Sequence, residues 1–456
     1  MMRTAVLWSI LHGVLAANFG VLGHSYSEML KHAPPGIRYD IPTATRPWNS
    51  MKNSVTKTSR YVSQLRPVQA GRTIKSNARS VAAILGANQR RVGGDGSENI
   101  MSTSAYGTQY AIDALWDGLA LSMLIDTGSS DTWAVQKDFN CVDYGGQHLP
   151  QSACGFGGPY PETFKYGLTD PEMYMFIQYA DGEVVTGPMG FSDITIGNIT
   201  VKKQQVCLAN TTYWFGNNYT SGLMGLAFPA LTNAYVGDIL SHQWEDSIQY
   251  SPLFTSMVNQ GMIDPVFSMA IDRNESTGML TFGGVAPATG VDMSRIASLD
   301  MVIAQVISLP ETAHEYSFYT VIPDGWQYGR TTDTKKFPYI VDSGTTLNYL
   351  PPDLVDSINQ AFQPPAVYMW MYGAYFTACN AMAPQVAVIL DGIEFWINPV
   401  DLIYRSLVDP LTGLCLTAIS KGGTGPYILG DVFMQNALVV FDVGGAKMRF
   451  IPRQHY

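Results

Sequence analysis

Charged residues are scarce in this sequence: Lys, Arg, Asp and Glu make up only 14% of its 456 residues, whereas hydrophobic residues make up 46%. This balance excludes an intrinsically disordered chain, and 43 Gly without a three-residue period exclude a collagen-like one. Basic residues are the minority, and the net charge of −10 argues against a nucleic acid as partner. The length is sufficient for two or three domains, each with its own core.

Motifs that mark other enzyme classes are also missing. The sequence contains no H-E-x-x-H, C-x-x-C, phosphate-binding loop, G-x-G-x-x-G or G-x-S-x-G pattern. Only four of its seven His residues follow residue 91, and they are scattered at His148, His242, His314 and His455. The sequence therefore predicts neither a bound metal nor a cofactor.

The beginning of the chain has the pattern of a secretory signal. Arg3 precedes an apolar stretch at residues 5–16, and small residues follow it. We interpret residues 1–23 as a signal peptide, with an uncleaved signal anchor as the alternative. No later stretch holds 18 apolar residues. We therefore expect a secreted, extracellular protein without membrane attachment after processing, and the vacuole is the alternative destination.

The next segment differs from the remainder in charge. Residues 24–91 carry twelve basic residues against two acidic ones, so the remainder is more acidic than the overall net charge indicates. The segment ends in Arg90-Arg91, directly before a Gly-rich stretch, which is typical of cleavage by a dibasic-specific protease. We interpret it as a pro-segment that binds the acidic body through surface charge and inhibits it.

The body, residues 92–456, reads mainly as β-strands, with short runs of Val, Ile, Tyr, Phe and Thr between Gly, Asn, Asp and Pro. Few helices are expected. One is predicted at residues 251–261, with Ser251 as its N-cap and Gly261 just past its end, and another at residues 351–362.

An internal repeat divides this body. LIDTGSSDTW at residues 124–133 is echoed by IVDSGTTLNY at residues 340–349, and GLMGLA at 222–227 is echoed by YILGDV at 427–432. Because the echoes come in the same order, we expect two related lobes, residues 92–285 and 286–456.

The repeat indicates a specific chemistry. Each copy places an Asp, Asp126 or Asp342, after an apolar strand, followed by Gly and hydroxyl residues that can hold the carboxylate. If the lobes face each other, the two carboxylates lie side by side and share one proton, because both cannot ionise cheaply. Such a pair can take a proton from water and give one to a carbonyl oxygen.

These motifs resemble the pepsin-like aspartic proteases, most of all the secreted fungal type. DTGSSDTW and VDSGTT match the two active-site signatures of that family, YADGEVVTG is similar to its flap hairpin, and the run from GPYILGDV to RFIP is similar to its C-terminal part. The resemblance covers nearly all of residues 92–456. It implies a mainly β, bilobal fold, a pepsin-like double β-barrel with short helices and a cleft between the lobes.

The resemblance also implies roles for matching residues. Asp126 and Asp342 would be the catalytic dyad. Tyr179 would be the flap tyrosine, hydrogen-bonded toward Trp133, and Leu223 would line the pocket for the residue before the cleaved bond. The positions that would support the dyad are Thr127, Gly128, Ser129, Ser343, Gly344 and Thr345. Of these, Ser129 and Thr345 would bond the outer carboxylate oxygens, and Thr127 and Ser343 would link the loops.

The sequence departs from the family pattern around the flap. Ala180 replaces the usual Gly, and Ser221 replaces a common Asp. Asp181 stands where several fungal members carry an acid near the specificity pocket, and Glu183 adds a second one. Both acids are read either as specificity residues, with Asp181 allowing Lys before the cut, or as solvated turn residues.

Five cysteines in a secreted chain leave one over. The resemblance implies a disulfide between Cys379 and Cys415, and Cys141 and Cys154 fit a bridge in a first-lobe loop. Cys207 is then a buried free thiol, although an exchanged pairing with it stays open. The predicted glycosylation sites, which begin N-x-S/T sequons, are Asn198, Asn210, Asn218 and Asn274.

We therefore predict a monomeric aspartic endopeptidase, made as a zymogen, that hydrolyses protein or peptide substrates in acid. Two alternatives remain at this point: an inactive protein of the same fold that binds or inhibits, and a two-carboxylate glycosidase.

Overall fold

The computed structural model describes residues 62–68, 109–180, 182–237, 248–271, 278–286, 288, 290–303, 315–370, 372–423 and 427–454, and in residues 62–68 only the backbone. The predicted signal peptide and most of the predicted pro-segment lie outside these ranges, as do Asp181 and Asn274. Among the described residues, no helix is long and apolar enough to cross a membrane.

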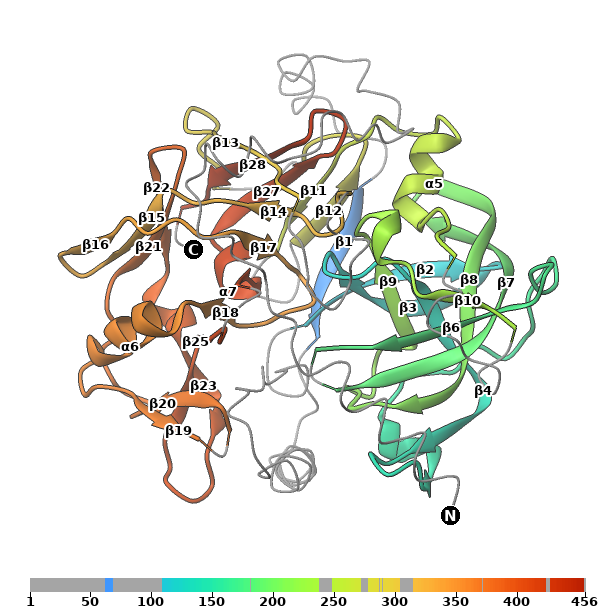
Figure 1. Ribbon diagram of the computed structural model, residues 1–456, viewed down its shortest axis with the longest axis horizontal. Coiled ribbons are helices and arrows are strands. Elements are labelled where there is room, and N and C mark those ends of the chain that lie inside the picture. The colour runs from blue at the N-terminus through green and yellow to red at the C-terminus, as the bar shows by residue number, and fades with distance from the viewer. Residues whose placement is uncertain are drawn as a thin grey trace.

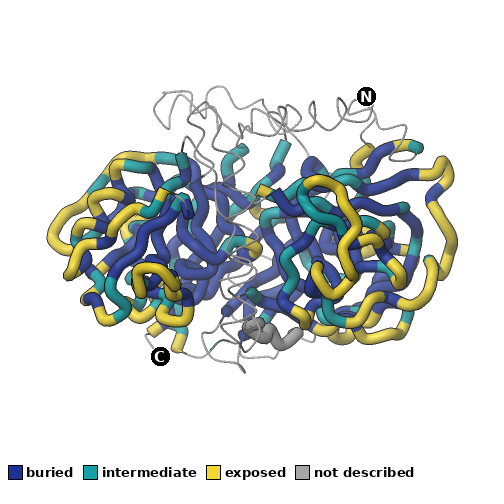
Figure 2. Tube along the Cα trace, turned by 90° about the horizontal axis from the view of Figure 1, so that it is seen from below, coloured by how far each residue is buried: buried dark blue, intermediate teal, exposed yellow. Residues whose placement is uncertain are grey.

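The described chain consists mainly of strands, as predicted, arranged in two β-rich halves (Figure 1). Figure 2 shows the two halves side by side, each with buried chain inside and exposed loops outside. In the first half and the following segment the strands are β1 (Val62–Val68), β2 (Gln109–Trp116), β3 (Leu119–Asp126), β4 (Thr132–Val142), β5 (His148–Leu149), β6 (Met173–Gln178), β7 (Val184–Ile196), β8 (Ile199–Tyr213), β9 (Gly222–Gly225), β10 (Ala234–Val236), β11 (Phe267–Ala270), β12 (Gly278–Phe282) and β13 (Ala297–Asp300).

The second half contains shorter strands. They are β14 (Thr320–Val321), β15 (Gly325–Tyr328), β16 (Thr331–Asp333), β17 (Tyr339–Val341), β18 (Asn348–Leu350), β19 (Val367–Met369), β20 (Ala374–Thr377), β21 (Val386–Leu390), β22 (Ile393–Ile397), β23 (Ile403–Val408), β24 (Cys415–Thr417), β25 (Ile419–Lys421), β26 (Tyr427–Leu429), β27 (Ala437–Asp442) and β28 (Lys447–Pro452). The described α-helices are α5 (Leu253–Asn259), α6 (Pro352–Gln360) and α7 (Asp431–Met434).

One large sheet runs through both halves. Its strand order is β10-β6-β7-β8-β4-β9-β3-β2-β1-β12-β11-β27-β28-β13. β1, which belongs to the predicted pro-segment, pairs antiparallel with β2 on one side and with β12 on the other. A strand of that segment therefore bridges the two parts of the sheet. The second half has three further sheets, ordered β14-β17-β26-β18-β25, β16-β15-β21-β22 and β19-β20-β24-β23.

The repeat seen in the sequence is also a repeat of strand pairing. β3, which ends at Asp126, pairs parallel with β9, and β4 pairs antiparallel with β9. In the second half β17 ends just before Asp342 and pairs parallel with β26, and β18 pairs antiparallel with β26. Each Asp therefore stands at the end of a strand that is held by its echo strand.

The predicted helices are present. α6 buries Leu354 and Ile358, the apolar face expected from their spacing. α5 differs from the prediction at its start, because its N-cap is Pro252 and not Ser251, and no side chain caps it. Gly261 follows its end with a φ of 66°, a left-handed conformation that glycine adopts without strain.

Aromatic packing joins the two halves behind the Asp-bearing strands. Phe267 of β11 stacks on Phe441 of β27 with ring centroids 4.3 Å apart, and Tyr319 packs edge-on against both rings. The Tyr319 hydroxyl also donates to the Leu226 carbonyl at 2.6 Å. Each buried aromatic side chain of this kind contributes about 1.5–3 kcal/mol, so the seam between the halves is a well-packed core.

Candidate active site

Asp126 and Asp342 lie against each other's loops. A methyl group on Gly128 would come within 2.7 Å of the Asp342 carboxyl, and one on Gly344 would come closer still to the Asp126 carboxyl. Only glycine leaves room for the opposite carboxylate at these two positions. The structure therefore brings the two predicted acids together at the seam between the halves.

Each carboxylate accepts two hydrogen bonds from its own loop, one from the backbone N–H two residues on and one from the hydroxyl three residues on. These bonds are Gly128 N to Asp126 Oδ1 at 2.7 Å, Ser129 Oγ to Asp126 Oδ2 at 2.5 Å, Gly344 N to Asp342 Oδ1 at 2.8 Å and Thr345 Oγ1 to Asp342 Oδ2 at 2.6 Å. The bonds fix both carboxylates in the same orientation relative to their loops.

Beneath the carboxylates, Thr127 and Ser343 connect the two loops. Thr127 N donates to Ser343 Oγ at 3.2 Å, and Ser343 N donates to Thr127 Oγ1 at 3.0 Å. Each hydroxyl then donates across the seam to a carbonyl before the other Asp, Thr127 to Val341 and Ser343 to Ile125, both at 3.0 Å. Four bonds between loops more than 200 residues apart set the spacing of the carboxylates.

The surroundings of Asp126 hold a proton on the pair. Burial raises the pKa of Asp126 to about 8, and the negative charge of Asp342 acts in the same direction. The bonds from Ser129 and Gly128 lower that pKa only in part. One carboxyl of the pair therefore keeps its proton at a pH at which an ordinary Asp is ionised, which gives one acid and one base at a single point.

A hairpin of the first half carries Tyr179 beside this pair. β6 leads into its turn and β7 leads out. Trp133 Nε1 donates to the Tyr179 hydroxyl at 2.8 Å, so these two residues are hydrogen-bonded as the resemblance implies. Burial, and then the charge of Asp126, raises the pKa of Tyr179 well above its ordinary value, so the phenol lies within the field of the carboxylate.

An aromatic cluster backs this hairpin, and the sequence reasoning missed its central member, Trp214. The Trp214 ring packs edge-on against Tyr179 and Trp133 with centroids 5.6 and 5.1 Å away, and it stacks on Phe156. Leu223 is buried in the same cluster. The signal in the sequence was the aromatic run YWF at residues 213–215, which precedes GLMGLA by a short Gly- and Asn-containing stretch.

The two flap acids have different outcomes. Asp181 lies outside the described residues, so its specificity role stays a prediction. Glu183 is only 2% exposed, which contradicts its interpretation as a solvated turn residue. Its carboxylate accepts a hydrogen bond from Phe215 N at 2.6 Å, and this bond offsets part of the cost of burial.

Two further buried acids near the site were not predicted. Asp131 is fully buried and accepts hydrogen bonds from Asn233 and from the Tyr250 hydroxyl. Asp431, in the second echo, is also buried, and its Oδ1 makes no hydrogen bond within the described part of the chain. Burial raises the pKa of both, and the charges of Asp342 and Asp126 raise that of Asp431 further.

The structure contains both expected disulfides, Cys141–Cys154 and Cys379–Cys415. Cys207 is a buried free thiol. Of the four sequons, those at Asn198, Asn210 and Asn218 begin with exposed residues, and Asn274 lies outside the described ranges.

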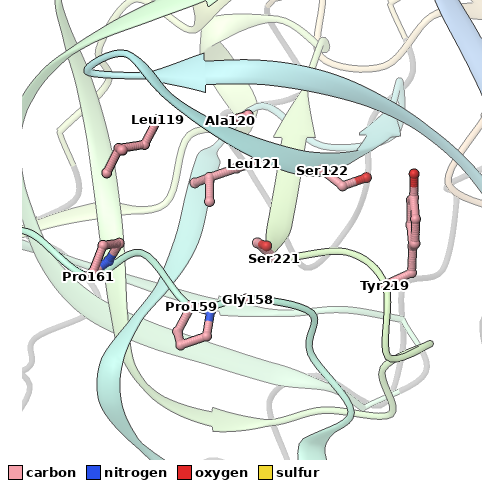
Figure 3. Close-up of a pocket in the computed structure, with 9 residues that line it drawn as sticks. All are labelled: Leu119, Ala120, Leu121, Ser122, Gly158, Pro159, Pro161, Tyr219 and Ser221. Atoms are coloured by element: carbon pink, nitrogen blue, oxygen red, sulfur yellow. The ribbon is translucent and has the colours of Figure 1, made fainter.

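A cavity of about 390 Å³ lies elsewhere on the first half (Figure 3). The start of β3 and two loops line it, with the side chains Leu119, Ala120, Leu121, Ser122, Gly158, Pro159, Pro161, Tyr219 and Ser221. Neither Asp126 nor Asp342 contributes to it, so it is separate from the candidate site.

Comparisons with known proteins agree with this geometry. The family model for eukaryotic aspartyl proteases matches residues 118–452. The chain is 37% identical over 408 residues to a protein of Aspergillus fumigatus named as a probable aspartic-type endopeptidase, which covers 87% of this chain and 88% of that protein. It is 25% identical over 355 residues to penicillopepsin-3 of Penicillium janthinellum, covering 77% of this chain and 80% of the relative.

A solved structure supports the fold alone. The aspartic proteinase from Irpex lacteus aligns with a TM-score of 0.57 at 18% identity, over 76% of this chain and 94% of that one.

Proposed function

This chain belongs to the eukaryotic aspartyl protease family and is an aspartic-type endopeptidase, and we propose that Asp126 and Asp342 are its catalytic dyad. The observation that carries the proposal is the matched support of the two carboxylates. Each accepts one backbone and one hydroxyl hydrogen bond, and Thr127 and Ser343 join the loops below. Such support keeps two carboxyl groups at the fixed separation that shared-proton chemistry needs.

In the proposed mechanism a water molecule lies between the carboxyl groups. The ionised carboxyl takes a proton from the water, the water oxygen attacks the peptide carbonyl, and the protonated carboxyl donates its proton to the carbonyl oxygen. The tetrahedral intermediate then collapses, and the leaving amine takes up a proton from the dyad. No covalent bond to the enzyme forms. In this proposal the Tyr179 hairpin covers the bound peptide and excludes bulk water, and Asp181 contributes to specificity on that hairpin.

The enzyme is made as a zymogen in this proposal, with residues 24–91 as the inhibitory segment between a signal peptide at 1–23 and a two-lobed body at 92–285 and 286–456. Two observations support it. The segment is strongly basic and the remainder acidic, and β1 pairs with β2 and β12 in the large sheet. As carboxylates of the body protonate in acid, the attraction weakens and the segment leaves.

Activity at acidic pH is supported by the buried carboxyl groups. Burial raises the pKa of Asp126, Asp131 and Asp431, so acid keeps these groups neutral and avoids the cost of buried charge. A secreted monomer is the state that best fits the predicted signal peptide, the two disulfides and the exposed sequons, of which Asn198 lies in the tight turn between β7 and β8.

The dyad is tested by casein hydrolysis at about pH 4, with and without pepstatin, for the wild type, Asp126→Asn and Asp342→Asn. We expect pepstatin to inhibit the wild type and each variant to lose at least about 10³-fold in kcat, because the acid–base pair is broken. Circular dichroism checks that the variants are folded. A folded variant with unchanged hydrolysis would end the dyad assignment.

The zymogen is tested separately by incubating the purified full-length precursor at falling pH and rising salt. We expect faster loss of the pro-segment under both changes, because both weaken charge attraction. Release that depends on neither pH nor salt contradicts the proposed switch.

A further inference from the structure

Glu183 is an acid buried at the tip of the Tyr179 hairpin. Its backbone carbonyl accepts from Tyr179 N at 2.8 Å and closes the turn, and its side chain is 2% exposed. The carboxylate points away from solvent, where Oε1 accepts from Phe215 N at 2.6 Å. A buried carboxylate is costly unless it is bonded in this way, so a local function has to account for its place.

The bond from Phe215 continues the pairing of β7 with β8, which joins Val184 to Tyr213, as far as the tip of the hairpin. Phe215 directly follows Trp214, whose ring contacts both Tyr179 and Trp133. The Glu183 carboxylate and the Trp133–Tyr179 hydrogen bond therefore add two side-chain contacts to the β7–β8 pairing, one to the backbone beside Trp214 and one through the phenol.

The hairpin itself does not need this bond in order to form. β6 pairs with the beginning of β7, from Gln178–Val184 to Tyr174–Pro188, and Thr186 Oγ1 donates across this pair to the Met175 carbonyl at 2.7 Å. The bond from Phe215 instead fixes where the tip of the hairpin lies relative to the Trp214 ring.

We propose that Glu183 is a positioning residue that latches the Tyr179 hairpin to the wall formed by Trp214, so that both bind the substrate as one preformed surface. The inference rests on the proposed role of this hairpin as the cover of the dyad. Preformed surfaces avoid the cost of ordering a loop when substrate binds, so loss of the latch should weaken substrate binding more than the chemical step.

Three variants of Glu183 distinguish the effect of its side-chain length from the effect of its charge. Glu183→Ala removes the acceptor, Glu183→Asp keeps the charge but withdraws it by one methylene, and Glu183→Gln keeps an acceptor oxygen at the same reach. The assay measures kcat and KM on an internally quenched peptide built around a casein bond that the wild type cleaves. We expect Glu183→Ala and Glu183→Asp to raise KM about tenfold with kcat within about twofold, and Glu183→Gln to stay near the wild type.

Thr186→Val is the matched control, because it removes a hydrogen bond of the same hairpin without touching Phe215, and its KM should not change. If Glu183→Ala does not fold, Glu183→Asp carries the test. The latch is wrong if Glu183→Asp keeps the wild-type KM, or if Glu183→Gln is impaired as strongly as Glu183→Ala. Either result leaves the dyad intact, provided that Asp126→Asn is inactive and pepstatin inhibits the wild type; an active Asp126→Asn contradicts the proposed site instead.

Discussion

The loops that carry Asp126 and Asp342 have nearly the same local structure but different surroundings. Each Asp ends or follows a strand paired parallel with an echo strand, and each accepts the same two kinds of hydrogen bond. Seven residues further on the loops diverge. Trp133 donates to Tyr179 of the hairpin, whereas Tyr349, at the equivalent position, is buried in the core of the second half.

This comparison separates two functions of the fold. The duplicated loops supply symmetry, which places two chemically equivalent carboxyl groups against each other. In the proposed site the cover, the Tyr179 hairpin, comes from the first half only, so the two faces of the site differ. One proton can be held on the pair without any difference between the loops themselves, because two adjacent carboxylates cannot both ionise cheaply.

The disulfides offer the largest contrast between the halves. Cys379–Cys415 closes a loop with a sequence separation of 36, and Cys141–Cys154 one of 13. Chain-entropy arguments predict that replacing both cysteines by serine costs about 4 kcal/mol for the longer loop and about 3 kcal/mol for the shorter one. Denaturant titration of the two double variants measures this. A larger loss for Cys141/Cys154 would show that packing of the first half, and not loop closure, dominates.

The glycines test how far the two Asp loops are equivalent. Gly128→Ala and Gly344→Ala each push a methyl group onto the opposite carboxylate, which its hydrogen bonds hold in place. We expect each to lower kcat about 100-fold, because a misplacement of about 1 Å has this effect in catalytic sites. Gly158→Ala, with open space around the added methyl group, is the control and should retain full activity. A large difference in kcat between Gly128→Ala and Gly344→Ala would show that the two Asp loops are not equivalent.

The buried acids beside the two loops make the stability of the protein depend on pH. Burial raises the pKa of both Asp131 and Asp431. A carboxyl group with a raised pKa stabilises the fold at a pH below its unfolded pKa of about 3.8. This stabilisation is lost as the pH rises through the pKa of the folded state. The free energy of unfolding should therefore fall with rising pH, by up to about 1.4 kcal/mol per pH unit for each group.

Replacing Asp431 by Asn should reduce the fall of the unfolding free energy with rising pH more than replacing Asp131 by Asn does. Several hydrogen bonds offset the burial of Asp131, whereas the Oδ1 of Asp431 has no partner among the described residues. Thermal melts from pH 4 to pH 8 measure the two slopes, and equal slopes contradict the argument.

Much of the site could be predicted because it depends on local sequence. The two D-[ST]-G loops and their echoes are short motifs that can be found in the sequence, and the family resemblance of these motifs implied the Trp133–Tyr179 bond. Trp214 and Asp431 were not assigned because their position depends on packing between strands far apart in the chain. The sequence left Glu183 open between a specificity residue and a solvated turn residue for the same reason: a hairpin tip is exposed unless another segment covers it, and only the structure shows Phe215 there.

The Tyr179 hydroxyl gives the smallest expected effect and tests the asymmetry directly. Tyr179→Phe removes the acceptor of the Trp133 N–H, and a neutral hydrogen bond of this kind contributes about 1 kcal/mol, so kcat/KM should fall about fivefold. Tyr166→Phe removes a hydroxyl bond to Asp193 on the same half and should leave kcat/KM unchanged. If Tyr179→Phe is also unchanged, the Trp133–Tyr179 hydrogen bond is not needed to hold the cover, and the difference between the halves then lies in their aromatic surfaces.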